Sequence, residues 1–252
     1  MTPSERRREI INLLLTEGYV EAKELSDRLG VDISTVRRDL DALARTNQVQ
    51  RTHGGARPVP GAPMELPYAM KQGEHLAAKR AIARAAAARV QDGDTVVLDS
   101  GSTTYEIALA LTHHRGLTVI TNDLRICKFI AQNPNMRLLV TGGELLNSVY
   151  TLVGEHSVGF FDDFTADTTF LGADAVDPVA GITNTNTLEV PVKRAMIAAS
   201  RTTLVVADST KFGRRTLARV AAVGEVAGFI TDTSLPEGDE VGYGELTRAA
   251  PE

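Results

Sequence analysis

Apolar side chains recur every three or four positions in three short stretches near the start of the chain, which is the spacing of one buried helix face. The first carries Ile10, Leu13 and Leu14, the second Ala22, Leu25 and Leu29, and the third Val36, Leu40 and Leu43. Gly18 follows the first stretch, and Gly30-Val-Asp32 separates the second from the third. Two helices joined by so short a turn predict a helix-turn-helix, with Asp32 capping its second helix.

After these helices the pattern changes to the alternation of a β-strand around a glycine pair. Residues 48–57 alternate on either side of Gly54-Gly55, which predicts a hairpin, the wing of a winged helix-turn-helix. Residues 58–67 then hold four prolines, as in a stiff, extended linker. We therefore place a winged helix-turn-helix domain at residues 3–58 and a linker at residues 59–74.

From residue 75 onward, short apolar runs alternate with helical stretches. The runs that predict strands are residues 95–98, 117–121, 137–141, 168–171, 203–207 and 228–231, and the helical stretches are residues 76–90, 105–111, 124–132 and 188–199. This alternation predicts an α/β domain over residues 75–235, with a mostly parallel sheet covered by helices. We expect residues 236–252 to form a disordered tail.

Composition supports a folded chain whose charge is unevenly placed. In 252 residues, 43% are hydrophobic, which is enough for a sizeable core. The net charge of -5 excludes a chain that is basic throughout, so any contact with nucleic acid needs a local patch. Residues 1–57 carry ten basic and nine acidic side chains, a net +1, and the remainder carries -6.

Several classes of protein are disfavoured. Cys127 is the single cysteine, which excludes an internal disulfide framework and a cysteine-rich zinc site, and the five histidines lack the spacing of metal ligands. We expect no metal and no cofactor. The sequence has neither the apolar run of a signal peptide nor about 18 consecutive apolar residues, so we expect a soluble cytoplasmic protein with no membrane partner.

The third helical stretch and the wing carry the side chains that DNA requires. Arginine can bind guanine with two hydrogen bonds, and hydroxyl groups contact phosphates. An arginine pair on a helix is ordinarily a solvated face, but here it lies on the second helix of a tight pair followed by a wing, which favours double-stranded DNA. The predicted DNA-binding residues are Ser34, Thr35, Arg37, Arg38, Arg51, Thr52, His53 and Arg57. Among them we expect Thr35 and Arg38 to reach base edges.

A second group of polar residues follows the predicted strands. A loop of Ser, Thr and Gly at a helix N-terminus presents N–H groups and hydroxyls to one point, which suits a phosphate, although an ordinary capped turn has the same composition. Further strand ends carry similar groups at the edge where open α/β sheets bind ligands. The predicted effector-binding residues are Asp99, Ser100, Gly101, Ser102, Thr103, Thr104, Thr121, Asn122, Gly142, Gly143, Asp174, Lys193 and Lys211.

These motifs resemble the DeoR-type family of bacterial transcriptional regulators over nearly the whole chain. The resemblance rests on Glu24-Leu-Ser-Asp-Arg-Leu-Gly-Val31, Ser34-Thr-Val-Arg-Arg-Asp-Leu40, Arg51-Thr-His-Gly-Gly-Ala56, Leu98-Asp-Ser-Gly-Ser-Thr-Thr104, Val119-Ile-Thr-Asn122, Thr141-Gly-Gly-Glu144, Leu171-Gly-Ala-Asp174 and Val206-Ala-Asp-Ser-Thr-Lys211. Asn47 departs from the glycine usual there, but asparagine also tolerates a left-handed backbone. The family's sensor domain is similar to ribose-phosphate isomerase, which implies a phosphorylated sugar or polyol as effector.

That similarity raises an enzyme as the alternative. Asp174 and Lys211 match residues of the isomerase active site, but its catalytic carboxylate falls at Lys193, which cannot act as the base of an enediol mechanism. Glu189, one helical turn earlier, is a weak substitute. We therefore predict a regulator without catalytic residues, a homo-oligomeric repressor of sugar or polyol catabolism genes that its effector releases from operator DNA. In the other alternative, the winged helix binds protein.

Overall fold

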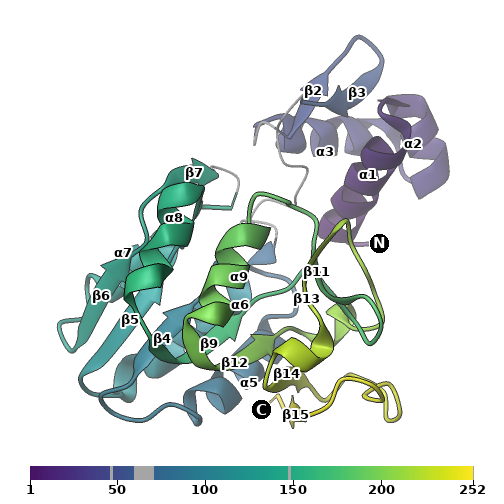
Figure 1. Cartoon of the computed structure of the whole chain (residues 1–252). Coiled ribbons are helices and arrows are strands. Elements are labelled where there is room, and N and C mark those ends of the chain that lie inside the picture. The colour runs from purple at the N-terminus through teal and green to yellow at the C-terminus, as the bar shows by residue number, and fades with distance from the viewer. Residues whose placement is uncertain (46–47, 60–70, 147–148, 252) are drawn as a thin grey trace. The chain divides into compact units, whose positions relative to one another are not determined.

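The computed structural model describes residues 1–45, 48–59, 71–146 and 149–251, in two compact units (Figure 1). The first unit comprises residues 1–74 with 147–149, and the second comprises residues 75–146 with 150–252. Most of the expected linker and Asn47 lie outside the described residues.

The first unit contains the three predicted helices, α1 (Pro3–Glu17), α2 (Ala22–Leu29) and α3 (Ile33–Arg45). Gly30 ends α2 in a left-handed conformation, with φ 63°, and Asp32 Oδ1 accepts the backbone N–H of Ser34 at 2.7 Å. These two residues produce the predicted tight turn and helix cap. The apolar faces meet in a shared core in which Ile10, Leu14, Leu25, Val36, Leu40 and Leu43 are fully buried.

The predicted wing is an antiparallel hairpin of β2 (Val49–Arg51) and β3 (Gly55–Pro58). A two-residue strand that the sequence did not indicate, β1 (Val20–Glu21), pairs with the other edge of β3. Gly55 allows this pairing, because a Cβ atom there would lie 2.1 Å from the carbonyl oxygen of Val20. The glycine therefore joins the wing to the helices.

The second unit is built on a seven-stranded parallel sheet in the order β15-β14-β12-β9-β4-β5-β6. Its strands are β4 (Thr95–Leu98), β5 (Leu117–Thr121), β6 (Met136–Val140), β9 (Ala166–Leu171), β12 (Ser200–Val206), β14 (Gly228–Asp232) and β15 (Leu246–Ala249). The helices are α5 (Leu76–Ala87), α6 (Ser102–Ala110), α7 (Leu124–Ile130), α8 (Glu155–Gly159) and α9 (Val190–Ala198). The predicted α/β class is thus confirmed.

Helices cover both faces of this sheet. The main core cluster joins α5, α6 and α7 to alternate residues of the central strands, including Val96, Leu98 and Phe170. The remaining strand residues point to the opposite face, because side chains alternate along a strand. There α9 contacts β9 and β12, and Figure 1 shows α8 and α9 on the same side of the sheet.

The expected disordered tail is wrong for residues 246–249. They form β15, which pairs with β14 in the register Phe229↔Leu246 to Asp232↔Ala249. Only the last residue of β15 is buried, so the strand depends on backbone hydrogen bonds and lacks the apolar alternation that marks a strand in a sequence.

Smaller elements were also absent from the prediction. They are the hairpin β7 (Glu144–Leu146) with β8 (Thr151–Val153), the antiparallel strands β10 (Ala175–Asp177), β11 (Gly181–Asn184) and β13 (Ala218–Ala221), and the 3-10 turns η1 (Leu111–His113), η2 (Phe160–Asp163), η3 (Ser209–Lys211) and η4 (Val223–Glu225). Each is three or four residues long, and none stands out in the sequence as a β-branched run.

Candidate DNA-binding surface and effector site

The solvent face of α3 is polar and partly pre-ordered. Ser34, Arg37 and Arg38 are exposed and Thr35 is half-buried. The guanidinium of Arg38 donates to the Ser34 carbonyl and to Thr35 Oγ1, at 3.3 Å each. These contacts hold Arg38 over the N-terminal turn of α3, the part of a recognition helix that approaches base edges.

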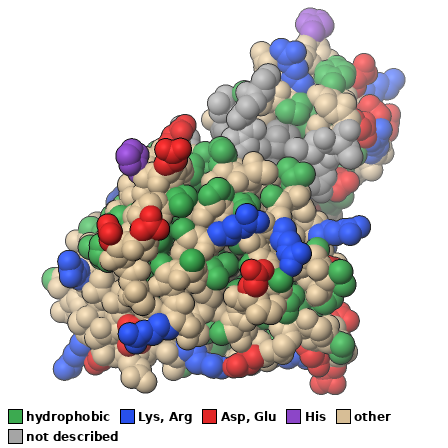
Figure 2. Space-filling view, in the orientation of Figure 1, with side chains coloured by type: hydrophobic (Ala, Val, Ile, Leu, Met, Phe, Trp, Pro, Cys, Tyr) green, Lys and Arg blue, Asp and Glu red, His purple; other side chains and the backbone are tan. Residues whose placement is uncertain are grey.

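The predicted wing residues divide between solvent and local contacts. His53 is exposed. Figure 2 shows basic, acidic and hydrophobic side chains intermingled on the visible face of this unit. Thr52 Oγ1 accepts the Gly55 N–H at 3.2 Å and so shapes the turn. Arg51 lies 3.4 Å from Asp41 of α3, and Arg57 donates to Gln50 at 3.0 Å. Arg51 therefore ties the wing to α3.

A buried carboxylate that the sequence analysis did not single out anchors α1 to α3. Asp39 is 2% exposed and accepts hydrogen bonds from Arg6 Nε at 2.5 Å and from Arg7 Nε at 2.7 Å. Arg6 is itself buried. Arg6 and Arg7, in the arginine-rich start of α1, therefore hold α1 against α3. Their partner, Asp39, is the acidic residue of the Arg-Arg-Asp-Leu motif.

In the second unit, the predicted effector residues lie at the carboxyl edge of the sheet. The ends of β4 and β5 lie side by side, since the two strands are neighbours. Thr121 Oγ1 donates to the Leu98 carbonyl at 2.6 Å and accepts the N–H of Asp123 at 3.1 Å. The structure thus brings the loop 99–104 against residues 121–123.

The loop after β4 is fastened to α9 by a buried ion pair. Lys193 Nζ bonds to Asp99 Oδ2 and donates to the Gly172 carbonyl at 3.0 Å, while Asp99 also accepts the Gly172 N–H at 2.9 Å. Both side chains are almost completely buried. Burial opposes the charge on Lys193, but the carboxylates of Asp99 and Glu189 outweigh it and raise the pKa of Lys193. Lys193 therefore neutralises Asp99.

The first turn of α6 is the part of this edge most suited to an anion. Ser102 and Thr103 are half-buried there, with the positive end of the helix dipole beneath them. Thr104 is buried, and its hydroxyl donates to the Gly101 carbonyl at 3.0 Å. Ser102 and Thr103 are thus the hydroxyl-bearing residues of this turn that face its surface.

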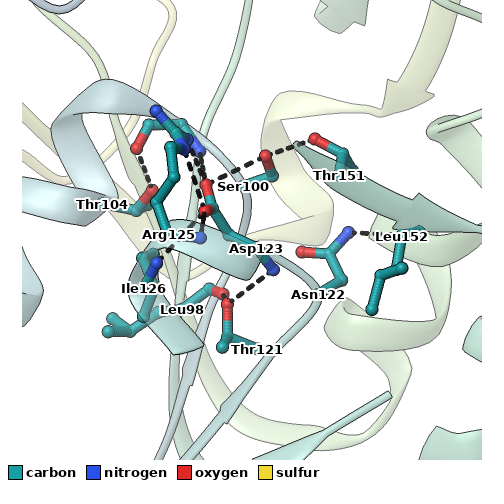
Figure 3. A network of polar contacts seen from close by, with 11 residues as sticks. Leu98, Ser100, Thr104, Thr121, Asn122, Asp123, Arg125, Ile126, Thr151 and Leu152 are labelled. Atoms are coloured by element: carbon teal, nitrogen blue, oxygen red, sulfur yellow. Dashed lines mark hydrogen bonds and ion pairs between the residues drawn. The ribbon is translucent and has the colours of Figure 1, made fainter. Parts of the chain in front are cut away.

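Asp123 is the centre of a polar network between the β4 and β5 ends (Figure 3). Its carboxylate accepts from Ser100 Oγ at 3.2 Å, from the Gly101 N–H at 3.3 Å and from the backbone N–H groups of Arg125 and Ile126 at 2.8 and 3.2 Å. Burial raises the pKa of Asp123 to about 7 against these hydrogen bonds, which lower it. Asp123 thus caps α7 and holds the loop after β4.

Arg125 completes the network and was missed by the sequence analysis. Its Nε donates to Asp123 Oδ1 at 3.1 Å, its Nη2 pairs with Asp123 Oδ2, and its guanidinium lies 5.7 Å from the ring centre of Tyr150. Burial lowers the pKa of Arg125 to about 9. The sequence did offer a signal, an Asp-Leu-Arg sequence that begins two residues after the strand and whose acid caps the next helix.

The other predicted effector residues lie further along the edge. Gly142 and Gly143 follow β6, and the Gly142 carbonyl accepts from Ser157 Oγ at 2.5 Å. Asp174 follows β9 and accepts the Thr185 N–H at 2.9 Å. Lys211 lies in η3 after β12.

Both units match models of one protein family. The DeoR-like helix-turn-helix domain matches residues 6–59, and the DeoR C terminal sensor domain matches residues 74–233. The chain belongs to the DeoR family. A DNA-binding domain and a sensor domain of this family in one chain make it a transcriptional regulator, as the sequence predicts.

Relatives of this DeoR-type chain match it along nearly its whole length. The glycerol-3-phosphate regulon repressor of Escherichia coli is 32% identical over 94% of this chain and 93% of its own length. The regulator GlpR of Haloferax volcanii is 34% identical over 93% and 92%. Because these relatives are transcriptional regulators, they confirm the prediction of a regulator over an isomerase.

Solved structures match more weakly. Ribose 5-phosphate isomerase A of Methanocaldococcus jannaschii has a TM-score of 0.39 and 17% identity over 53% of this chain and 52% of its own. That likeness supports no argument about function. Across the described residues, no group of three or more His, Cys, Asp or Glu side chains could hold a metal ion. No helix in the described ranges is long and apolar enough to cross a membrane.

Proposed function

We propose that this DeoR-type chain represses genes for the use of a sugar or polyol and that a phosphorylated form of that compound releases it from DNA. The near full-length similarity to glycerol-3-phosphate regulon repressors carries the proposal. Glycerol 3-phosphate is accordingly the first compound to test. A regulator of chromosomal genes acts in the cytoplasm.

On the DNA side, α3 lies in the major groove, with Thr35 and Arg38 at base edges and Ser34 and Arg37 on phosphates. The pre-ordered Arg38 supports this assignment, because a side chain held in place loses less entropy on binding. The wing contacts the DNA backbone through Arg51, Thr52, His53 and Arg57. The protein binds as a homo-oligomer, since one small module rarely reaches specific affinity alone.

On the effector side, the phosphoryl group binds the first turn of α6. Ser102, Thr103 and the backbone N–H groups of that turn supply donors, and the dipole of α6 favours the negative charge. Residues at the neighbouring strand ends contact the sugar or polyol part of the effector.

The experiment is fluorescence anisotropy of the intact protein on DNA from upstream of its own gene and neighbouring operons. We expect salt-dependent, sequence-specific binding, and an effector that weakens it about 5- to 150-fold. The panel contains glycerol 3-phosphate, a pentose 5-phosphate, a hexose 6-phosphate, glycerol and inorganic phosphate.

Arg38→Ala is expected to abolish specific binding, whereas Arg115→Ala, at an exposed position in the sensor unit, leaves it intact. Absence of salt-dependent binding would favour a protein-interaction role for the winged helix. Turnover of a sugar phosphate by the purified protein would favour an isomerase.

A further inference from the structure

We propose that Arg125 is the cation that binds the phosphoryl group of the effector. This inference rests on the proposed function, because it assigns a residue to the same site. Arg125 follows β5, the strand adjacent to β4, and its guanidinium lies in the network that holds the loop before α6 (Figure 3).

The charges at this edge leave a role for Arg125. A phosphate monoester carries nearly two negative charges at neutral pH. The Lys193 side chain is 3% exposed, whereas the Arg125 side chain is 14% exposed. Lys211 follows β12, which is separated from β4 by β9. Neighbouring strands are about 4.8 Å apart, so the end of β12 is roughly twice as far from the α6 turn as the end of β5.

Shared contacts place the guanidinium beside that turn. Asp123 Oδ2 accepts from the Gly101 N–H at 3.3 Å and from Ser100 Oγ at 3.2 Å, and the same oxygen pairs with Arg125 Nη2. Three donors that meet at one oxygen are close neighbours. Arginine has five N–H donors in a planar fork, so it can bind a carboxylate along one edge and a phosphate along another.

The two acidic side chains nearby do not repel a phosphate as free carboxylates would. Asp99 is paired with Lys193, and Asp123 is paired with Arg125. The net charge of these four residues around the loop 99–104 is therefore zero. The dipole of α6 and the backbone N–H groups of its first turn then favour the binding of an anion.

A second observation concerns Asn122, the residue before Asp123, which has an unsatisfied polar atom. Asn122 is 1% exposed, and its Nδ2 donates to the Leu152 carbonyl at 3.2 Å, while its Oδ1 is buried and has no hydrogen-bond partner among the described residues. Figure 3 shows this oxygen turned toward Asp123. A buried acceptor without a donor is unfavourable. The hydroxyl of a sugar or polyol phosphate supplies that donor.

The test is calorimetric titration of the intact protein with glycerol 3-phosphate, the other phosphorylated compounds of the panel, and inorganic phosphate. We expect Arg125→Gln to weaken binding of the phosphorylated effector at least tenfold and Arg125→Lys to recover part of the loss. Arg115→Gln is the matched control, because Arg115 is exposed and precedes β5, at the opposite end of the strand. It should bind within twofold of the wild type.

The double variant Asp123→Asn/Arg125→Gln separates effector binding from a structural role, because it leaves neither charge unpaired. If Arg125 binds phosphate, the double variant binds the phosphorylated effector as weakly as Arg125→Gln does. If Arg125 only neutralises Asp123, the double variant recovers most of the affinity that Arg125→Gln loses, and the proposal is wrong. Should Arg125→Gln not fold, the double variant with Asp123→Asn removes both charges and is expected to bind at least tenfold more weakly.

The outcomes also separate this inference from the proposed function. Wild-type binding that Arg125→Gln retains within twofold would overturn the role of Arg125 and leave the sensor function standing. A wild type that binds no phosphorylated compound of the panel would overturn both.

Discussion

Replacement of Asp39 by alanine tests how the DNA-binding unit holds together. The Asp39 side chain is 2% exposed, and the Arg6 side chain bonded to it is 9% exposed. The substitution therefore leaves a buried guanidinium without its counter-ion, which costs about 3–5 kcal/mol. Domains have free energies of unfolding of about 5–15 kcal/mol, so the loss is a large part of the stability of this unit. DNA binding should fall with it, although Asp39 is buried away from solvent.

The assay is hydrogen exchange of the intact protein, followed in peptides from α1 and α3. A loss of 3 kcal/mol speeds exchange of the most protected amides by on the order of 100-fold. Asp41→Ala is the control, because Asp41 lies on the same helix, is 58% exposed and is 3.4 Å from Arg51. Such a pair contributes under about 1 kcal/mol. Equal exchange in the two variants would refute the assignment of Asp39 as an anchor.

Three further changes probe other features. Gly55→Ala should separate β1 from β3 and lower the thermal stability of the first unit, because its Cβ would overlap the Val20 carbonyl; an unchanged melting temperature contradicts this. Lys193→Met should lower the free energy of unfolding, measured in urea, by about 3–5 kcal/mol because it leaves Asp99 unpaired, and adding Asp99→Asn should restore most of that loss. If the double variant is as destabilised as Lys193→Met, the two residues are not coupled. Burial tends to raise the pKa of Asp232, but hydrogen bonds from neighbouring serines outweigh it and lower the pKa. Stability from this carboxylate is thus present above pH about 4 and lost as pH falls through the lowered pKa, and Asp232→Asn should flatten that acid dependence.

Much of the fold was predictable because it depends on local patterns. The strand at residues 95–98 and the strand at residues 117–121 have the predicted bounds, since β-branched runs bordered by polar turns are unambiguous. The helix predicted at residues 105–111 begins at Ser102 in the structure, because hydroxyl side chains at a helix start look like loop. The strand at residues 246–249 depends on a partner, β14, that no local pattern reveals.

The site was predictable in its location but not in its pairings. Strand ends rich in Gly, Ser and Thr indicated the edge of the sheet. A lysine on a helix gives no sign that it reaches a carboxylate 94 positions away, as Lys193 reaches Asp99. Likewise, the arginines at the start of α1 look like a solvated turn until Asp39 is placed beside them. Burial of a charge is a tertiary property, and only the partner's position decides it.

The Lys193–Asp99 ion pair links the loop after β4 to helix α9. A movement of the loop either breaks this buried ion pair or moves α9 together with the loop. The next residue of α9, Arg194, donates hydrogen bonds to the carbonyls of Arg219 and Val220 on β13 at 2.8 and 3.0 Å. The loop after β4 is thus connected through α9 to the small antiparallel sheet by the side chains of two consecutive residues, Lys193 and Arg194.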